Sequence, residues 1–336
     1  MRPLVSVSVK ASSMGDLRCR NWESEAFERL KEGVKSGSLS MVTNALKNEA
    51  DPNGMIEETS PYYLDPVRCL KENFIKDRNI LHLACERGDP KIVHELLEYG
   101  AEVNAPTKTW KKTPLHIACV AGHASVVEEL IAYEADKRIR SADCLMTPLE
   151  VAALFRHADC CQILLEADAD PDSLNGMYGS TPLTHACGQG DYELVELFLA
   201  HDANPNLKVR MTPLYRAVPF PEILELLLSK GAKVDGTNAS DAPEHAAGAQ
   251  ALHQAAYLGL EEAVRILLEA GADPEALNSF AETPLDLAKT HLEYRKKELT
   301  TYLNMQSQHQ KISLREIETA RDMVEKLQKV VALFDS

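Results

Sequence analysis

Seven segments of the chain share one pattern of small, polar and apolar residues. Each contains a leucine, usually preceded by Thr-Pro, and the leucines are separated by 34, 34, 34, 31, 38 and 33 residues. They are Leu81, Leu115, Leu149, Leu183, Leu214, Leu252 and Leu285. A period of this length is typical of stacked arrays, so the pattern predicts one small structural unit that occurs several times.

The residues around each leucine predict a helix, a turn, a second helix and an extended loop. Thr113-Pro114 marks a helix start, because the threonine side chain accepts a backbone N–H and proline needs no donor at the first helical position. Small pairs such as Ala118-Cys119 keep the first helix thin, so that neighbouring units can approach. Gly122 suits the turn between the two helices, where a left-handed backbone is easiest for glycine.

Three units lack the glycine that ends the second helix elsewhere. Glu134, Asp168 and Asp202 stand where Gly100, Gly231 and Gly271 occur in other units. If the left-handed geometry is kept, each exchange costs on the order of 1 kcal/mol.

The repeated unit resembles the ankyrin repeat, whose pattern is Thr-Pro-Leu-His, paired alanines, a glycine turn, an Ile-Val-x-x-Leu-Leu helix and Gly-Ala-Asp-Val-Asn. Residues 77–288 carry the resemblance, and residues 111–136 form the best-matching copy. It implies an all-α solenoid of helix-turn-helix units with β-hairpin-like loops. It also implies non-catalytic protein binding on a concave face made of hairpin tips and first helices.

Outside these repeats the pattern predicts four further segments. They are a disordered tail at 1–21, an N-terminal capping repeat at 22–53, an inserted loop at 54–76, and a C-terminal helical cap with an amphipathic helix at 289–336. The fifth Thr-Pro-Leu unit is contracted, with Pro219-Phe220-Pro221 in place of the glycine turn. The connection at 236–250 is longer than usual and is expected to be a loop.

The last helix has an apolar stripe at alternating spacings of three and four residues, formed by Ile317, Ala320, Val324, Leu327, Val331 and Phe334. Such a stripe buries one face of a helix. Two interpretations remain open. The helix either packs back on the array as a cap or serves as a docking helix or short coiled coil, with self-association as one form.

Charge and composition restrict the partners. The formal net charge is −15. An acidic protein repels a phosphate backbone and attracts basic surfaces, so we expect a protein partner with a basic or mixed basic and apolar surface, and no nucleic acid. No apolar run approaches the roughly 20 residues of a membrane span, so no membrane partner is expected. Eight cysteines without a Cys-x-x-Cys pair indicate a reducing compartment, which predicts a cytoplasmic and possibly nuclear protein.

The sequence predicts no enzyme, cofactor or metal site. It contains no Gly-rich phosphate loop, Gly-x-Ser-x-Gly or His-Glu-x-x-His motif. The pairs His82/Cys85 and His116/Cys119 recur because the repeat recurs, which favours buried structural roles over metal binding. The adjacent Cys160 and Cys161 are expected to divide between core and solvent, with a reactive thiol as the alternative.

Candidate partner-binding residues follow from the resemblance and from side-chain type, because aromatic residues often anchor interfaces. The hairpin positions are Trp110, Lys112, Tyr178 and Phe280, and the first-helix positions are Val120, Leu154, Phe155, Gln189 and Tyr257. Asn104 resembles the hairpin asparagine that is hydroxylated in some ankyrin proteins, with a plain turn asparagine as the alternative.

The predicted function is a protein-binding scaffold or adaptor. The alternative is a substrate receptor of a ubiquitin ligase complex, because some families join such arrays to a C-terminal recruiting box. The segment at 313–318 lacks the cysteine that this box places after its leucine, which disfavours the alternative.

Overall fold

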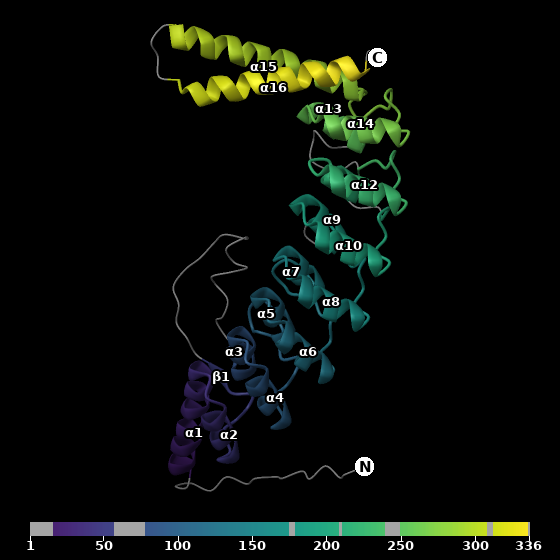
Figure 1. Ribbon diagram of the computed structural model, residues 1–336. Coiled ribbons are helices and arrows are strands. Elements are labelled where there is room, and N and C mark those ends of the chain that lie inside the picture. The colour runs from purple at the N-terminus through teal and green to yellow at the C-terminus, as the bar shows by residue number, and fades with distance from the viewer. Residues whose placement is uncertain are drawn as a thin grey trace. The chain divides into compact units, whose positions relative to one another are not determined.

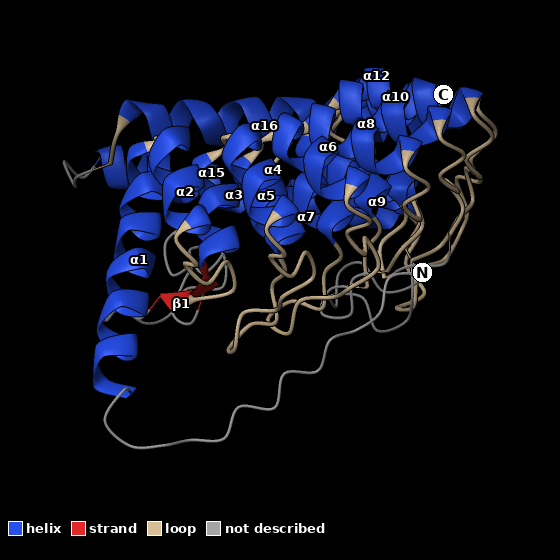
Figure 2. Ribbon diagram, turned by 90° about the horizontal axis from the view of Figure 1, so that it is seen from below, coloured by secondary structure: helices blue, strands red, loops and turns tan. Residues whose placement is uncertain are grey.

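The computed structural model describes residues 16–56, 78–174, 179–207, 210–238, 249–307 and 312–334, with side chains from residue 25 onward. Two compact units are present, Met1–Asp143 and Cys144–Ser336 (Figure 1). In each unit the described helices form pairs, and the loops leave the helices on one side (Figure 2). The expected all-α architecture of helix-turn-helix repeats is confirmed.

Within its described residues, the first unit contains three helix pairs and one pair of short strands. Its elements are α1 (Asp16–Ser36), α2 (Leu39–Lys47), β1 (Met55–Ile56), β2 (Arg78–Asn79), α3 (Ile80–Arg87), α4 (Pro90–Glu98), α5 (Pro114–Ala121) and α6 (Ala124–Ala132). The strands are antiparallel, with Met55 opposite Asn79 and Ile56 opposite Arg78. First helices pack on first helices and second helices on second helices, as α3 on α5 and α4 on α6.

The second unit continues the same pairing. Its elements are α7 (Pro148–Leu154), α8 (Ala158–Glu166), α9 (Pro182–Gln189), α10 (Tyr192–Ala200), α11 (Pro213–Ala217), α12 (Pro221–Ser229), α13 (Ala251–Leu258), α14 (Glu261–Glu269), α15 (Pro284–Ser307) and α16 (Leu314–Phe334). The contraction of the fifth Thr-Pro-Leu unit shortens its first helix, since α11 has five residues where α9 has eight. The repeat leucines of this unit are buried, as at Leu149 and Leu183, except for Leu285 in the last helix pair, which is half-buried.

The repeat motif begins helices in the way its chemistry predicts. Thr147 accepts a hydrogen bond from the backbone N–H of Glu150, and the Glu150 side chain accepts one from the backbone N–H of Thr147. In α3 the partners are Asn79 and His82, and the His82 ring also reaches the carbonyl of Lys112 in the next repeat at 3.0 Å. One side chain therefore caps its own helix and links two repeats.

The second helices end in left-handed residues whether or not glycine is present. Glu134, Asp168 and Asp202 have φ values of 61°, 62° and 61°, close to the geometry that glycine adopts at the other ends. The expected geometry is confirmed at all three positions. The cost of about 1 kcal/mol at each is offset by the repeat packing that holds the turn in place.

Both ends of the array differ from the expected boundaries. Helix α1 begins at Asp16, so residues 16–21, expected in the disordered tail, are helical. The helical cap expected from residue 289 is present but is not a separate element, since the last Thr-Pro-Leu helix continues through it as α15 to Ser307. The inserted loop expected at 54–76 lies outside the described residues from 57 onward, and its first residues enter β1.

Helix α16 covers the end of the second unit. It packs against α13, α14 and α15, and it buries Ile317, Ala320, Leu327 and Val330. Leu327 lies over Gly259, where an added Cβ would sit 3.3 Å from the leucine side chain. Of the two interpretations of its apolar stripe, the packing corresponds to the cap. Among the described helices, none combines the length and apolar character that a membrane span requires.

Candidate functional site

The loops of the first unit are held together by asparagine side chains. Asn53 accepts a hydrogen bond from the backbone N–H of Glu102 at 2.7 Å and donates one to the carbonyl of Gly100. Asn104 repeats this contact one unit later, where its side-chain oxygen accepts from the N–H of Asp136 at 2.8 Å. These hydrogen bonds join consecutive loops and hold in place the parts of the loops that lie next to the helices.

Trp110 is positioned by this framework. Its carbonyl accepts a hydrogen bond from the N–H of Ala142 at 2.7 Å, and the next residue, Lys111, has a left-handed φ of 52°. The indole is exposed. The loop position and the exposure expected for Trp110 are confirmed, and partner binding at this position stays a prediction.

Lys112 does not have the exposed position expected from its place in the loop. Its ammonium lies 2.8 Å from the carboxylate of Asp143, and the side chains are only 3% and 9% exposed. The Lys112 backbone is also tied to Thr107, which donates its N–H to the Lys112 carbonyl and accepts the Lys112 N–H on its hydroxyl. Lys112 is therefore a structural residue, and its assignment to partner binding was wrong. This burial was not predictable from the sequence, because Lys is rarely buried unless paired and its partner lies 31 positions away.

Four of the five first-helix candidates are half-buried in their units. Val120 lies at the end of α5. In the second unit, Leu154 ends α7, and its carbonyl accepts a hydrogen bond from the Gln189 amide at 2.9 Å. Phe155 stacks on His157 with ring centroids 6.3 Å apart. Gln189 and Phe155 thus have contacts within the protein, and they offer a partner only part of their surface.

Tyr257 stands out among the first-helix candidates because its side chain is exposed and also ordered by a neighbour. Its ring stacks on His291 of α15, with centroids 4.4 Å apart and planes 13° apart. His291 accepts a hydrogen bond from Arg295 Nε on its Nε2 atom and therefore donates from Nδ1 to the Tyr257 carbonyl, at 2.6 Å.

The stack continues along α15. The ring of Tyr294 lies 6.5 Å from that of His291, and the Arg295 guanidinium lies 5.6 Å from the Tyr294 ring centroid. Tyr294 is exposed. Sequence reasoning missed His291, Tyr294 and Arg295 because they were placed in a cap. A signal was available, since His291 follows Tyr257 by 34 residues, the separation that recurs between the repeat leucines.

The remaining candidate positions are in loops of the second unit. Phe280 is exposed at the loop before α15, where its N–H donates to the Asn278 side chain. Tyr178 lies outside the described residues. The loop asparagine Asn206 reproduces the contacts of Asn53, accepting from the N–H of Lys233 and donating to the carbonyl of Gly231.

The cysteines do not divide between core and solvent. Cys160 and Cys161 are both fully buried, so the expectation that one faces solvent was wrong. Burial raises the pKa of the Cys160 thiol to about 12 and raises that of Cys161 as well. A buried thiol with a raised pKa is a poor nucleophile near neutral pH. Within the described ranges, no group of three or more His, Cys, Asp or Glu residues is arranged to hold a metal ion.

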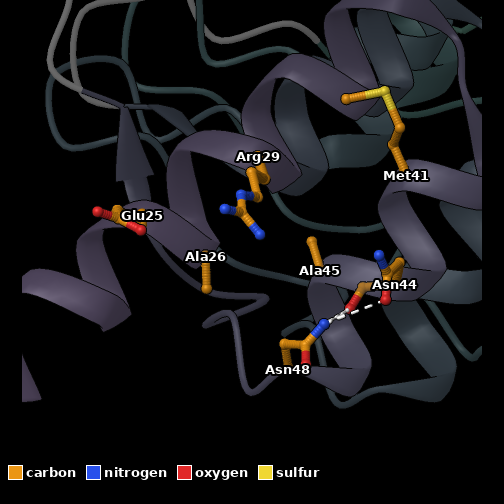
Figure 3. Close-up of a pocket in the computed structure, with 7 residues that line it drawn as sticks. All are labelled: Glu25, Ala26, Arg29, Met41, Asn44, Ala45 and Asn48. Atoms are coloured by element: carbon orange, nitrogen blue, oxygen red, sulfur yellow. Dashed lines mark hydrogen bonds between the residues drawn. The ribbon is translucent and has the colours of Figure 1, made fainter.

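A shallow pocket of about 300 Å³ lies between α1 and α2 (Figure 3). The small side chains of Ala26 and Ala45 leave the space, and Arg29, Met41 and Asn44 are among the residues around it. The Asn48 amide beside it is engaged with Asn44, donating to the Asn44 carbonyl at 2.7 Å. This mixture of apolar, cationic and amide side chains indicates no particular class of ligand.

Stacked helix pairs joined by hydrogen-bonded loops define a repeat protein of the interaction class. The family model described as ankyrin repeats (3 copies) matches residues 30–141, 81–175 and 149–238, and the model for a single ankyrin repeat matches residues 248–279. The chain belongs to the ankyrin repeat family. Ankyrin repeats are protein-binding modules, so the family implies protein–protein interaction.

Solved structures share this fold. The ankyrin repeat domain of human ASB11 is 28% identical, with a TM-score of 0.54 over 62% of this chain and 91% of that one. The ankyrin repeat domain of Bcl-3, described as a unique member of the IkappaB protein family, is 29% identical, with a TM-score of 0.54 over 62% of this chain and 92% of that one. A comparison with curated protein sequences gives no match.

Proposed function

We propose that this protein is a non-catalytic scaffold or adaptor that binds another protein through the first helices and hairpin loops of its repeats. The observation that carries the proposal is the Tyr257–His291–Tyr294 stack, which holds two exposed tyrosines in place on first helices of the second unit. Tyrosine is enriched among the residues that dominate binding energy at interfaces.

The stack lowers the cost of binding. An exposed tyrosine that is free to rotate must be immobilised when a partner binds, which costs about 0.5–1.5 kcal/mol for a rotamer-rich side chain. His291 already restrains Tyr257, and Arg295 lies against the Tyr294 ring. In the first unit, Trp110 provides a comparable anchor on a loop fixed by its bond to Ala142.

The partner is proposed to carry a basic or mixed basic and apolar surface. The net charge of −15 steers such a surface toward this protein and repels nucleic acid. The proposed location is the cytoplasm, with the nucleus as a second compartment. The six cysteines from residue 25 onward whose side chains are described support a reducing compartment, since all are buried thiols.

The packing of α16 makes the other uses of the C-terminus less favoured. Ile317, within the segment compared with a ligase recruiting box, is buried against the array, as are Leu327 and Val330. Self-association through the same stripe would require these residues to leave the cap. We therefore place the partner surface on the first helices and loops and keep the ubiquitin ligase receptor as the alternative.

The test is affinity capture followed by a binding measurement on the captured partner. Wild type is compared with a Tyr257→Ala/Tyr294→Ala variant, with a Trp110→Ala variant, and with Tyr99→Ala as a control. Tyr99 lies at the end of α4, on a second helix, and is 40% exposed, against 38% for Tyr257. We expect the first two variants to lose a partner that Tyr99→Ala retains, with equal circular dichroism. A partner list unchanged in both variants would contradict the proposal.

We also propose Asn104 as a hydroxylation site, because it is partly exposed on the loop that follows α4. Its side-chain oxygen is occupied by the Asp136 N–H. Mass spectrometry of the protein from cells, searched for a single added oxygen on Asn104, tests this assignment.

A further inference from the structure

Two aromatic residues break the repeat at the starts of second helices. The first residues of α4, α6, α8, α10, α12 and α14 are Pro90, Ala124, Ala158, Tyr192, Pro221 and Glu261. The residues just before them are Asp89, His123, His157, Asp191, Phe220 and Leu260. Tyr192 and Phe220 are thus large aromatic rings where the other repeats have proline, small, polar or aliphatic residues.

The structure brings these two residues into one groove. Helices α10 and α12 pack against each other (Figure 1). The ring of Phe220 lies against Gly190, where an added Cβ would sit 2.4 Å from the ring. The contact belongs to the repeat, since His123 lies in the same way over Gly88, where an added Cβ would sit 2.6 Å from the imidazole. Phe220 therefore places an apolar ring where another repeat has a histidine.

The groove has an apolar floor and an acidic rim. Its volume is about 690 Å³, and Tyr192, Phe220, Ile223 and Leu226 line it together with Glu222, Glu225 and Ser229. Tyr192 is 45% exposed, and Glu222 and Glu225 are exposed. Accessible apolar side chains beside carboxylates suit a peptide in which an apolar residue is flanked by basic residues.

The surrounding helices strengthen the negative charge. Neither α10 nor α12 contains lysine or arginine, and each carries two glutamates, Glu193 and Glu196 on α10 and Glu222 and Glu225 on α12. The adjacent α8 adds Asp159 and Glu166 without a cation, and Arg265 is the one cation of α14, where it pairs with Glu261. Two cations lie nearby, since Arg156 pairs with Asp191 at the start of α10 and Lys230 follows the end of α12. The acidic side chains named above outnumber them, so the field over this surface favours a cationic ligand.

We propose that the groove between α10 and α12 is a second docking surface, on the second helices, for a short basic segment of a partner protein. One bulky apolar side chain of the segment inserts between Tyr192 and Phe220, and flanking Lys or Arg side chains pair with Glu222 and Glu225. This surface is separate from the first-helix and loop surface of the proposed function.

The probe is a phage-displayed library of nine-residue peptides selected on the full chain. The strongest binder is made as a fluorescein-labelled peptide and measured by fluorescence polarisation. The variants Tyr192→Ala and Glu225→Gln copy residues that this chain already uses at the same repeat position, Ala124 and Gln162, so both are compatible with the fold. Glu166→Gln is the charge control, because Glu166 is exposed on α8 and does not line the groove.

We expect selected peptides with an aromatic or aliphatic residue flanked by Lys or Arg. Tyr192→Ala should weaken binding by about tenfold, as loss of an aromatic anchor does. Glu225→Gln should weaken it by about twofold to fivefold and reduce its salt dependence. Glu166→Gln should weaken binding less than Glu225→Gln does, because Glu166 contributes to the field but does not line the groove. A library without basic enrichment, or a binder whose affinity is the same for Tyr192→Ala, would overturn the proposal.

The Tyr257→Ala/Tyr294→Ala variant separates this surface from the proposed function. Peptide binding that survives this variant and is lost with Tyr192→Ala assigns the peptide to the groove. Peptide binding that depends on Tyr257 and Tyr294 instead of Tyr192 would assign it to the first-helix surface and overturn the groove.

Discussion

The imidazole of His291 lies face to face with the phenol ring of Tyr257, with centroids 4.4 Å apart, and bonds to the carbonyl of the same residue. One side chain of the cap thus orders an exposed tyrosine of the preceding repeat and also joins α15 to α13. Positioning of a candidate binding residue and attachment of the cap depend on the same contact.

This contact predicts a stability effect at His291. His291→Ala removes the ring stack and leaves the Tyr257 carbonyl without its donor, so we expect the free energy of unfolding to fall by about 1–3 kcal/mol. Urea denaturation followed by circular dichroism measures it. Tyr294→Ala is the control, because that ring is exposed, and a change within about 0.5 kcal/mol is expected. Equal effects of the two variants would show that the stack has no special role.

The buried ion pair between Lys112 and Asp143 predicts a non-additive result. Lys112→Met leaves a carboxylate in the interior without its cation, which should cost about 3–5 kcal/mol. The double variant Lys112→Met/Asp143→Leu removes both charges and should be more stable than Lys112→Met alone. Urea denaturation of the single and double variants tests this. A loss below about 1 kcal/mol in the single variant would mean that the pair behaves like an exposed one.

His82 predicts an acid-sensitive contribution to stability. Burial lowers its pKa from 6.5 to about 4, so between these values the unfolded chain binds a proton that the folded chain does not. Stability should therefore fall as the pH drops from 6.5 to 4, by at most about 1.4 kcal/mol per pH unit, and be unaffected by this group above that range. His82→Gln keeps a capping side chain without a titrating group. Its stability deficit relative to wild type should shrink between pH 7 and pH 4.5.

His94 provides a control in which the stability should depend on pH with the opposite sign. Its ring bonds to Glu129 at 2.7 Å, and this contact raises its pKa. The stabilisation from His94 is fully present below pH 6.5 and is lost as the pH rises through the raised pKa. The deficit of His94→Gln should therefore grow as the pH falls. Parallel pH profiles for His82→Gln and His94→Gln would contradict both assignments.

Substitutions of Gly190 and Gly231 should differ in their effect on stability, and the difference tests the position of Phe220 in the groove. Both have a left-handed φ, 68° and 83°, so alanine costs about 1 kcal/mol at either position. An added Cβ at Gly231 meets nothing within 4 Å, whereas at Gly190 it meets the Phe220 ring. Gly190→Ala should therefore cost about 1–3 kcal/mol more than Gly231→Ala. In a Phe220→Ala background the two costs should become similar. Thermal unfolding of the four variants measures the difference.

Much of the fold was predictable because its signals are local. Thr147 and Glu150 lie three residues apart and cap a helix by themselves. The position of Asp168 in the repeat predicts its left-handed backbone. The ends of the array were less predictable. Pro284 starts a helix that the repeat pattern would end near residue 288, but α16 provides a surface along which α15 continues to Ser307.

The candidate site was predictable only where a side chain's exposure follows from its place in one repeat. Trp110 and Phe280 are on loops and exposed, as expected. Gln189 bonds to the carbonyl of Leu154 in the preceding repeat, and that contact depends on how two repeats are stacked. The prediction for Lys112 was wrong for the same reason, since its ammonium group pairs with the carboxylate of Asp143 in the next loop.

The amino-acid order alone established the repeat, its helix starts and its turns, because capping bonds and left-handed residues act over three or four positions. Stacking of the repeats determined which side chains remain available. It buried Lys112, ordered Tyr257 against His291, and placed Tyr192 and Phe220 in one groove. Such contacts join residues about one repeat apart, and their strength depends on burial and close packing, which exist only once the repeats are assembled.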